Sequence, residues 1–198
     1  MAETWLPYDP EALTRLGVPS DTAAALGERG LPERAYGWFL RNPERELDVA
    51  ELPQCGPAAF LAQVNDGLTN TYWLRLADGS VWMRDGLRDE TGAKAYEIDQ
   101  SVRGLQGILA ALCGLWYSGL DQDDEGYEAA VIKATIEAVS AEPEAFADEQ
   151  NWWAGRLEEA QYTLPGMVRD DQMLYELVRR DEAGQWVLDH PGYEDEDG

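Results

Sequence analysis

The sequence contains few of the side chains, and none of the short motifs, that most enzymes use for catalysis. Histidine occurs once, at His190, and no Walker A motif, GxGxxG loop or GxSxG elbow is present. His190 has no Cys or His neighbour at metal-ligand spacing, so we expect an ordinary histidine rather than a ligand or a catalytic base. A carboxylate pair of the glycosidase type stays open as an alternative, because an acidic chain contains many such pairs. We therefore expect a protein that is not an enzyme and that binds no metal and no cofactor.

Cysteine is nearly absent, and long apolar runs are missing. Cys55 and Cys113 are the only cysteines and neither belongs to a CxxC pair, which predicts two reduced, buried side chains; a disulfide between them is the alternative. No stretch approaches the roughly 18 apolar residues that a membrane span needs. Residues 1–10 hold no basic side chain and no apolar run of signal-peptide length. We expect a cytoplasmic protein with no membrane partner.

Basic side chains are scarce, whereas acidic side chains are abundant. The chain has 15 Lys and Arg against 39 Asp and Glu, a formal net charge of −24. Residues 1–120 carry a net charge of −7 and residues 121–198 a net charge of −17. Such a field repels phosphates and anionic lipid heads and speeds encounter with basic partners. This pattern predicts a basic protein partner and no nucleic acid, and solubility alone is the simpler explanation of the same charge.

Turn signals and hydrophobic periodicity predict an α+β fold, in which helices flank a central antiparallel sheet. Short helices are expected at residues 10–16, 21–26 and 32–40, with Asp9 capping the first and Asp21 the second. Strands are expected at residues 47–52, 69–76, 81–83 and 96–98, and a tight turn at 77–80 joins the second and third strands in a hairpin.

Apolar residues then repeat at three- and four-residue steps from Val102 to Leu112. This period predicts a helix that runs to about Trp116, with Asp99 or Ser101 as its N-cap. Three glycines within it either weaken the helix or let it lie close against the sheet.

The last part of the chain predicts a helical extension that ends in a β-hairpin. Helices are expected at residues 127–139 and 143–157, and the terminal hairpin at residues 173–188, around a turn at 181–184. The acidic residues 194–198 are expected to be disordered. We accordingly divide the chain into an α+β domain of residues 1–118 and an acidic helical extension of residues 119–198 packed on it.

An acidic run after the long helix is the first candidate for contact with a partner. Asp121, Asp123, Glu125 and Gly126 match the start of a calcium-binding EF-hand loop. Position 12 of that loop is Ile132, which has no carboxylate, so we expect a solvated acidic loop that binds no metal.

Aromatic side chains are the second candidates for contact with a partner. Adjacent helical positions point about 100° apart, so Trp152 and Trp153 are both buried only if their helix is packed on two sides. Otherwise one of them is a surface anchor of the kind enriched at binding hot spots. The partner-binding residues predicted from the sequence are Asp121, Asp123, Asp124, Glu125, Trp152, Trp153, Tyr72 and Trp82.

Three short motifs follow one another along the chain. They are Leu31-Pro32-Glu33-Arg34-Ala35, then Leu76-Ala77-Asp78-Gly79-Ser80-Val81-Trp82 in the hairpin, then Ile98-Asp99-Gln100-Ser101-Val102 at the start of the long helix. Their order resembles the SUKH superfamily, most of all its fourth immunity subfamily, and the resemblance covers about residues 10–116. That subfamily has an Asn-Ser-Ser-Leu type sequence where this chain departs to Asp99-Gln100-Ser101-Val102.

The resemblance implies a function as well as an antiparallel α+β fold. It implies an immunity protein that neutralises a bacterial toxin by direct binding, without catalysis. An acidic inhibitor meets a basic toxin that attacks nucleic acid quickly, and it can cover the toxin's phosphate-binding cleft. A scaffold or regulatory module of the same superfamily, which bridges cellular proteins without neutralising a toxin, is the alternative. Family members bind different toxins through different surfaces, so the resemblance implies no particular interface residue.

Overall fold

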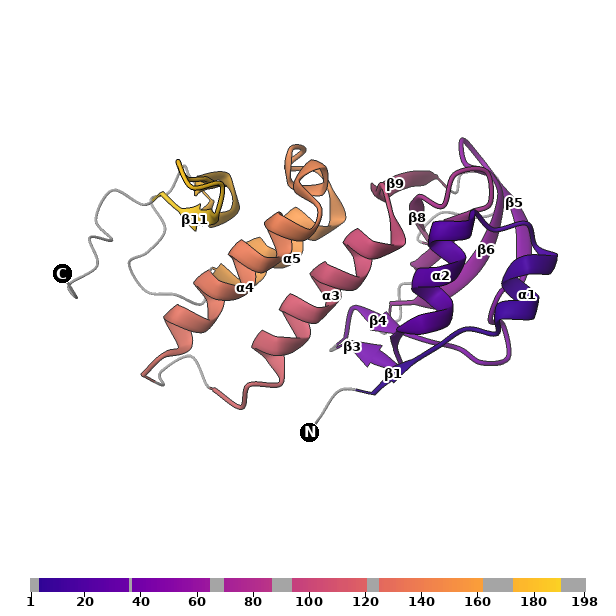
Figure 1. Cartoon of the computed structure of the whole chain (residues 1–198), viewed down its shortest axis with the longest axis horizontal. Coiled ribbons are helices and arrows are strands. Elements are labelled where there is room, and N and C mark those ends of the chain that lie inside the picture. The colour runs from indigo at the N-terminus through magenta and orange to yellow at the C-terminus, as the bar shows by residue number, and fades with distance from the viewer. Residues whose placement is uncertain are drawn as a thin grey trace.

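A curled antiparallel sheet of seven strands forms the centre of the fold, with helices packed against it (Figure 1). The computed structural model describes residues 4–35, 37–64, 70–86, 94–120, 125–161 and 173–189. The helices are α1 (Pro10–Arg15), α2 (Ser20–Glu28), α3 (Val102–Trp116), α4 (Tyr127–Ala141) and α5 (Trp152–Gln161), with two 3₁₀ turns, η1 (Pro143–Phe146) and η2 (Leu174–Leu177). The strands are β1 (Trp5–Leu6), β2 (Leu31–Pro32), β3 (Arg34–Ala35), β4 (Phe39–Leu40), β5 (Val49–Leu52), β6 (Gly56–Gln63), β7 (Thr71–Arg75), β8 (Val81–Arg84), β9 (Ala95–Asp99), β10 (Val178–Arg180) and β11 (Trp186–Leu188).

The central sheet has the strand order β3-β4-β6-β7-β8-β9, and β5 also pairs with β6. β6 is long enough to pair with β5 along its first half and with β4 at Gln63. A register shift between Phe60 and Ala62 interrupts its pairing with β7, and bulges of this kind bend a strand. Because side chains alternate along the strand, Ala59 and Leu61 enter the main core while Phe60 enters a second cluster on the other face. The α+β fold class with a central antiparallel sheet is thus confirmed.

The β7–β8 hairpin is closed by local bonds, as its sequence predicts. Gly79 adopts a φ of +81°, which favours glycine in this turn. The backbone N–H of Ser80 donates to Asp78 Oδ1 at 3.1 Å, and the N–H of Arg75 donates to the Ser80 carbonyl at 2.9 Å. Turn, register and strand propensity agree here, so this prediction is confirmed.

The prediction of a helix at residues 32–40 is wrong. These residues form β2, β3 and β4, and Ala35 pairs with Phe39 in a tight hairpin. The helical face inferred from Ala35, Trp38 and Phe39 spans barely one turn, which is too short to be stable without packing. The hairpin buries Trp38 and Phe39 in the main core instead, and Phe39 contacts the Tyr72 ring at 5.1 Å between centroids. Tertiary packing has overridden a weak local preference.

The predicted long helix is confirmed as α3, and Ser101 is its N-cap. The Ser101 Oγ accepts a hydrogen bond from the Gly104 N–H at 3.0 Å. Gly104 and Gly107 face the end of α4 rather than the sheet: a Cβ on Gly104 would overlap Glu142, and one on Gly107 would overlap Ala141. The close approach that the glycines permit is therefore between α3 and α4.

The C-terminal elements follow prediction with two differences. α4 and the β10–β11 hairpin are present, but the helix expected at 143–157 is divided into η1 and α5, and the first arm of the expected hairpin begins with the 3₁₀ turn η2 instead of a strand. Asp148 Oδ1 accepts from the Gln150 N–H, and Asn151 Oδ1 accepts from the Trp153 N–H at 3.0 Å. These side-chain bonds begin a new helix at Trp152, because Asp and Asn satisfy the first backbone donors of a helix. Near the N-terminus, Asp9 caps α1 as expected, whereas α2 begins at Ser20 without a side-chain cap.

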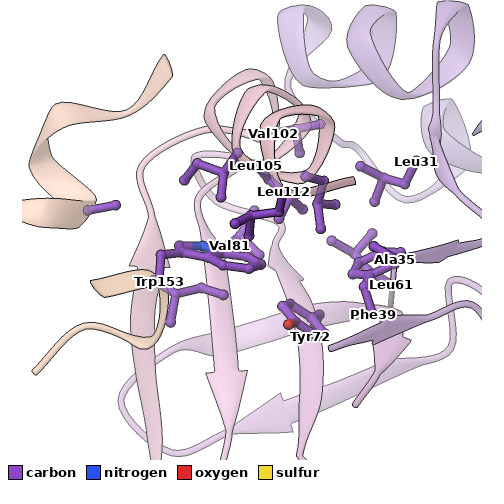
Figure 2. Close-up of a cluster of buried hydrophobic side chains, with 14 of the residues drawn as sticks. Leu31, Ala35, Phe39, Leu61, Tyr72, Val81, Val102, Leu105, Leu112 and Trp153 are labelled. Carbon is purple, nitrogen blue, oxygen red and sulfur yellow. The ribbon is translucent and has the colours of Figure 1, made fainter. Parts of the chain in front are cut away.

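One continuous core joins the sheet to the C-terminal helices. Figure 2 shows Trp153 of α5 lying beside Val81 and Tyr72 of the sheet, below Leu105 of α3. Tyr72 and Trp153 stack at 6.1 Å between centroids with an interplanar angle of 28°. Among the described residues, no helix has both the length and the apolar character needed to cross a membrane. The expected division at residues 118–119 and the disorder of residues 194–198 stay predictions, and the latter lie outside the described residues.

Candidate functional site

The described part of the C-terminal extension has few cations, and most of these already contact a partner. Lys133 pairs with Glu137 at 3.8 Å, Arg156 with Glu159 at 3.0 Å and Arg179 with Asp189 at 2.7 Å. The remaining cation of these segments, Arg180, lies over the Trp186 ring. Glu144, Asp148 and Glu149 of the extension are exposed, and no salt bridge joins them to a basic side chain of the described segments.

Five carboxylates lie on β9 and on residues 142–149, the segment that contacts β9 at η1 and is joined to it through Asn151, and we call them the acidic edge. They are Glu97, Glu142, Glu144, Asp148 and Glu149. No salt bridge joins any of them to a basic side chain of the described segments. Burial raises the pKa of Glu142, a hydrogen bond from Ser101 lowers it, and the charges of Glu144 and Glu97 raise it further. Glu142 is thus close enough to Glu97 for their charges to interact, although the two residues are far apart in sequence.

Glu142 is the inner member of the acidic edge and lies against the start of α3. Its side chain is 8 % exposed, and its Oε2 accepts a hydrogen bond from Ser101 Oγ at 3.3 Å. Gly104, in the first turn of α3, has no Cβ and so leaves room for this carboxylate. Backbone donors and the helix dipole favour negative charge at this end of a helix.

Asp99, at the end of β9, is the most deeply buried carboxyl beside the acidic edge. Its residue is 2 % exposed, and its Oδ2 accepts a hydrogen bond from Trp153 Nε1 at 2.9 Å. Its Oδ1 is buried and no described group lies within hydrogen-bonding distance of it. Burial raises the pKa of Asp99 well above its usual range; the Trp153 bond lowers it, and the charges of Glu142 and Glu97 raise it. The fold therefore favours a protonated Asp99.

The outer strand of the sheet adds an exposed aromatic side chain to this region. β9 pairs only with β8 among the described strands, and Tyr96 is 38 % exposed on it. The segment that carries Asp148 and Glu149 is tied to the same strand, because Asn151 Nδ2 donates to the Ile98 carbonyl at 3.1 Å. Burial raises the pKa of Tyr96, the charge of Asp85 raises it further and the charge of Arg156 lowers it, so an acidic and a basic side chain both lie near this ring.

The acidic run predicted from the sequence is only partly described. Asp121, Asp123 and Asp124 lie outside the described residues, and Glu125 is exposed immediately before α4. Tyr117 and Leu120, at 37 % and 36 % exposure, precede this run and are two of the five exposed large hydrophobic residues in the described segments. The prediction that the run contacts a partner stays a prediction.

The aromatic anchors predicted from the sequence are mostly interior residues. Tyr72 and Trp153 are fully buried, and Trp82 is 9 % exposed with its Nε1 donating to Ser80 Oγ at 2.9 Å. Tyr72 and Trp153 cannot contact a partner in this fold, so their assignment to an interface is wrong, whereas the assignment of Trp82 stays a prediction. The reason is packing on two sides of α5 and on both faces of the sheet. Trp152 is half-buried, with the Arg156 guanidinium 4.5 Å from its ring centroid.

Reasoning from the sequence missed the acidic edge. The pairs Glu142-Pro143-Glu144 and Asp148-Glu149 are visible in the sequence, but they look like any solvated helix surface. Only the tertiary contact of η1 and Asn151 with β9 brings Glu97 near Glu142.

The described segments give little support for metal binding or for nucleophilic catalysis by cysteine. They contain no group of three or more His, Cys, Asp or Glu side chains arranged to hold a metal ion, and His190 lies outside them. Cys55 and Cys113 are both buried and no disulfide joins them, as predicted. Burial raises the pKa of the Cys55 thiol to about 11, so it is protonated and a poor nucleophile at neutral pH. A shallow hollow beside α1, lined by Pro10, Glu11, Thr14 and Arg15, is open to solvent.

Comparison with known protein families, with curated proteins and with solved structures gave no match to this chain.

Proposed function

We propose that the protein is an immunity protein, which binds and neutralises a basic bacterial toxin through the acidic edge. The observation that carries this proposal is that five carboxylates lie on β9 and on the segment joined to it, and no salt bridge connects them to a basic side chain of the described segments. Holding like charges together costs free energy in the isolated protein. A cationic surface that covers them removes this repulsion.

The electrostatics of the whole chain support the same partner chemistry. With a net charge of −24, the protein attracts a basic partner over a distance comparable to the Debye length, about 8 Å at physiological salt. Toxin domains that cleave or modify nucleic acid have basic clefts, and an acidic protein can cover them. The three motifs that resemble the SUKH superfamily add support from sequence. The function does not require catalysis by this chain.

A charge-reversal variant with a matched control tests the proposal. The variant Glu144→Lys/Glu149→Lys changes two exposed members of the acidic edge, and Asp21→Lys/Glu28→Lys makes the same change in net charge on α2. A pull-down from lysate of the source organism, at low and at high salt, first identifies the partner. Association rates with that purified partner are then measured for all three proteins.

We expect one dominant basic partner that is lost at high salt and whose toxicity is abolished by co-expression of the unaltered protein. The edge variant should associate about tenfold more slowly, with a smaller salt dependence, and the α2 variant should lose much less. Equal losses in the two variants would show that net charge alone is responsible and would remove the acidic edge from the proposal. Several partners of mixed charge, without protection from any toxin, would favour a scaffold role.

A further inference from the structure

The C-terminal extension is joined to the sheet by three polar contacts between two short segments. Asn151 Nδ2 donates to the Ile98 carbonyl at 3.1 Å, Trp153 Nε1 donates to Asp99 Oδ2 at 2.9 Å, and Ser101 Oγ donates to Glu142 Oε2 at 3.3 Å. We call the side chains of Asp99, Ser101, Glu142, Asn151 and Trp153 the junction. They attach η1 and α5 to the end of β9 and the start of α3.

Asp99 is the member of the junction that has a buried oxygen atom without a hydrogen bond. A carboxylate at this position has one hydrogen bond, at Oδ2, and none at the buried Oδ1. Leaving a buried charge without compensating donors is far more costly than leaving a neutral carboxyl in the same place. The geometry itself therefore discriminates against the ionised form.

The charged groups around Asp99 act in the same direction. Glu97 approaches from β9 and Glu142 from the turn between α4 and η1, and both are acidic. From α5, the Arg156 guanidinium pairs with Glu159 and lies over Trp152, and no salt bridge joins Asp99 to a described basic side chain. Tyr72 of β7 is neutral at physiological pH, because burial raises its pKa well above its usual range. Ionisation of Asp99 thus adds a third negative charge to Glu97 and Glu142.

We propose that the junction is a proton-controlled latch, which is closed while Asp99 carries a proton and which releases η1 and α5 from β9 when Asp99 ionises. Release lets water reach Asp99 and separates it from Glu142, at the expense of the Trp153 contact. The latch regulates access to the inner part of the acidic edge, and it does not depend on which partner the edge binds.

The pH dependence has a definite sign. In the open state Asp99 has its ordinary pKa, near 4, and in the closed state its pKa is raised. The closed state therefore has its full advantage below the ordinary pKa and loses it as the pH rises. Between the two pKa values the opening equilibrium increases by up to about tenfold per pH unit, and it becomes constant above the raised pKa.

Hydrogen exchange of the α5 amides measures this opening. Exchange is compared at several pH values between 4, near the ordinary pKa of Asp99, and 9, after correction for the intrinsic exchange rate, in the unaltered protein and in Asp99→Asn. The asparagine keeps an oxygen acceptor for Trp153 but does not titrate. We expect corrected exchange in α5 to accelerate as the pH rises through this range in the unaltered protein, by up to about tenfold per pH unit until Asp99 is ionised in both states, without a matching change in β7, and to be independent of pH in the variant. The proposal is overturned if α5 shows no acceleration, or if Asp99→Asn accelerates equally.

A second readout does not depend on the folding of that variant. The indole N–H resonance of Trp153 should titrate with Asp99, because Asp99 is its hydrogen-bond acceptor. Glu142→Gln removes a like charge and should move the midpoint of this titration to lower pH. Glu149→Gln, which changes an exposed carboxylate of the acidic edge that does not affect Asp99, should leave the midpoint in place. An unchanged midpoint in Glu142→Gln would contradict the latch.

Discussion

Two ionisable side chains are buried near opposite edges of the central sheet, and their surroundings differ. Arg41, directly after β4, donates to the carbonyls of Leu6 and Leu31, pairs with Glu46 and lies over the Tyr8 ring. Asp99, at the end of β9, has a single hydrogen bond and two acidic neighbours.

The difference follows from what each group can do when it is buried. A guanidinium keeps its charge at any physiological pH, so the fold has to supply acceptors for it. A carboxyl can take up a proton instead, and an incomplete set of partners is then tolerated. Arg41 is therefore a fixed structural attachment of the N-terminal strands, whereas at Asp99 protonation and charge can change the structure.

The largest effect is expected from removing the guanidinium of Arg41. Arg41→Met leaves the Leu6 and Leu31 carbonyls and the Glu46 carboxylate without their donor, which should lower the free energy of unfolding by about 3 kcal/mol. Arg15→Met is the matched control: Arg15 is exposed and its salt bridges are 4.0 Å long, so a change within about 0.5 kcal/mol is expected. Urea unfolding measures both. Equal losses in the two variants would show that the buried arginine is not a structural attachment.

A smaller effect is expected from adding a side chain at Gly104, next to Glu142 of the junction. Gly104→Ala places a Cβ where the Glu142 carboxylate lies, so α4 has to move away from α3, and we expect a loss of about 2 kcal/mol. Gly114→Ala, in the same helix but with open space at its Cβ, should instead stabilise the protein by about 0.5 to 1 kcal/mol through higher helix propensity. Thermal unfolding separates the two signs, and stabilisation by both substitutions would refute the close approach at Gly104.

The smallest effect is expected in the pH dependence of stability, measured by removing the charge of Glu142. Burial and the nearby Glu144 and Glu97 raise the pKa of Glu142, so its contribution to stability is present at low pH and is lost as the pH rises through the raised value. Glu142→Gln should therefore be slightly more stable than the unaltered protein at pH 8, by about 0.5 kcal/mol, and the advantage should shrink at pH 5. Glu137→Gln, on the exposed face of α4, is the control and should show no such gain at pH 8. A gain that does not depend on pH would argue against repulsion at this edge.

Much of the fold could be predicted because its signals are local. The Asp78–Ser80 turn, the cap at Asp9 and the cap at Ser101 each use a bond between residues two or three positions apart. Such a bond forms in the same way whatever the rest of the chain does.

The candidate site could not be predicted in the same way. The acidic edge depends on the meeting of Glu97 with Glu142 and Glu144, and no periodicity in the sequence links these positions. The expected anchors Tyr72 and Trp153 were wrong for a related reason: aromatic residues are frequent both at interfaces and in cores, and only packing decides which.

The sequence by itself determined the composition of the interaction surface and most of the secondary structure. A chain with a net charge of −24 carries unneutralised carboxylates however it folds, and residues 77–80 form a turn in any compact arrangement. Tertiary structure alone decided that β2, β3 and β4 form where a helix was expected, that the end of α4 lies against Gly104 and Gly107, and that Asp99 is buried beside Trp153. The physical reason is that burial and charge repulsion depend on neighbours distant in sequence, whereas caps and turns depend only on adjacent residues.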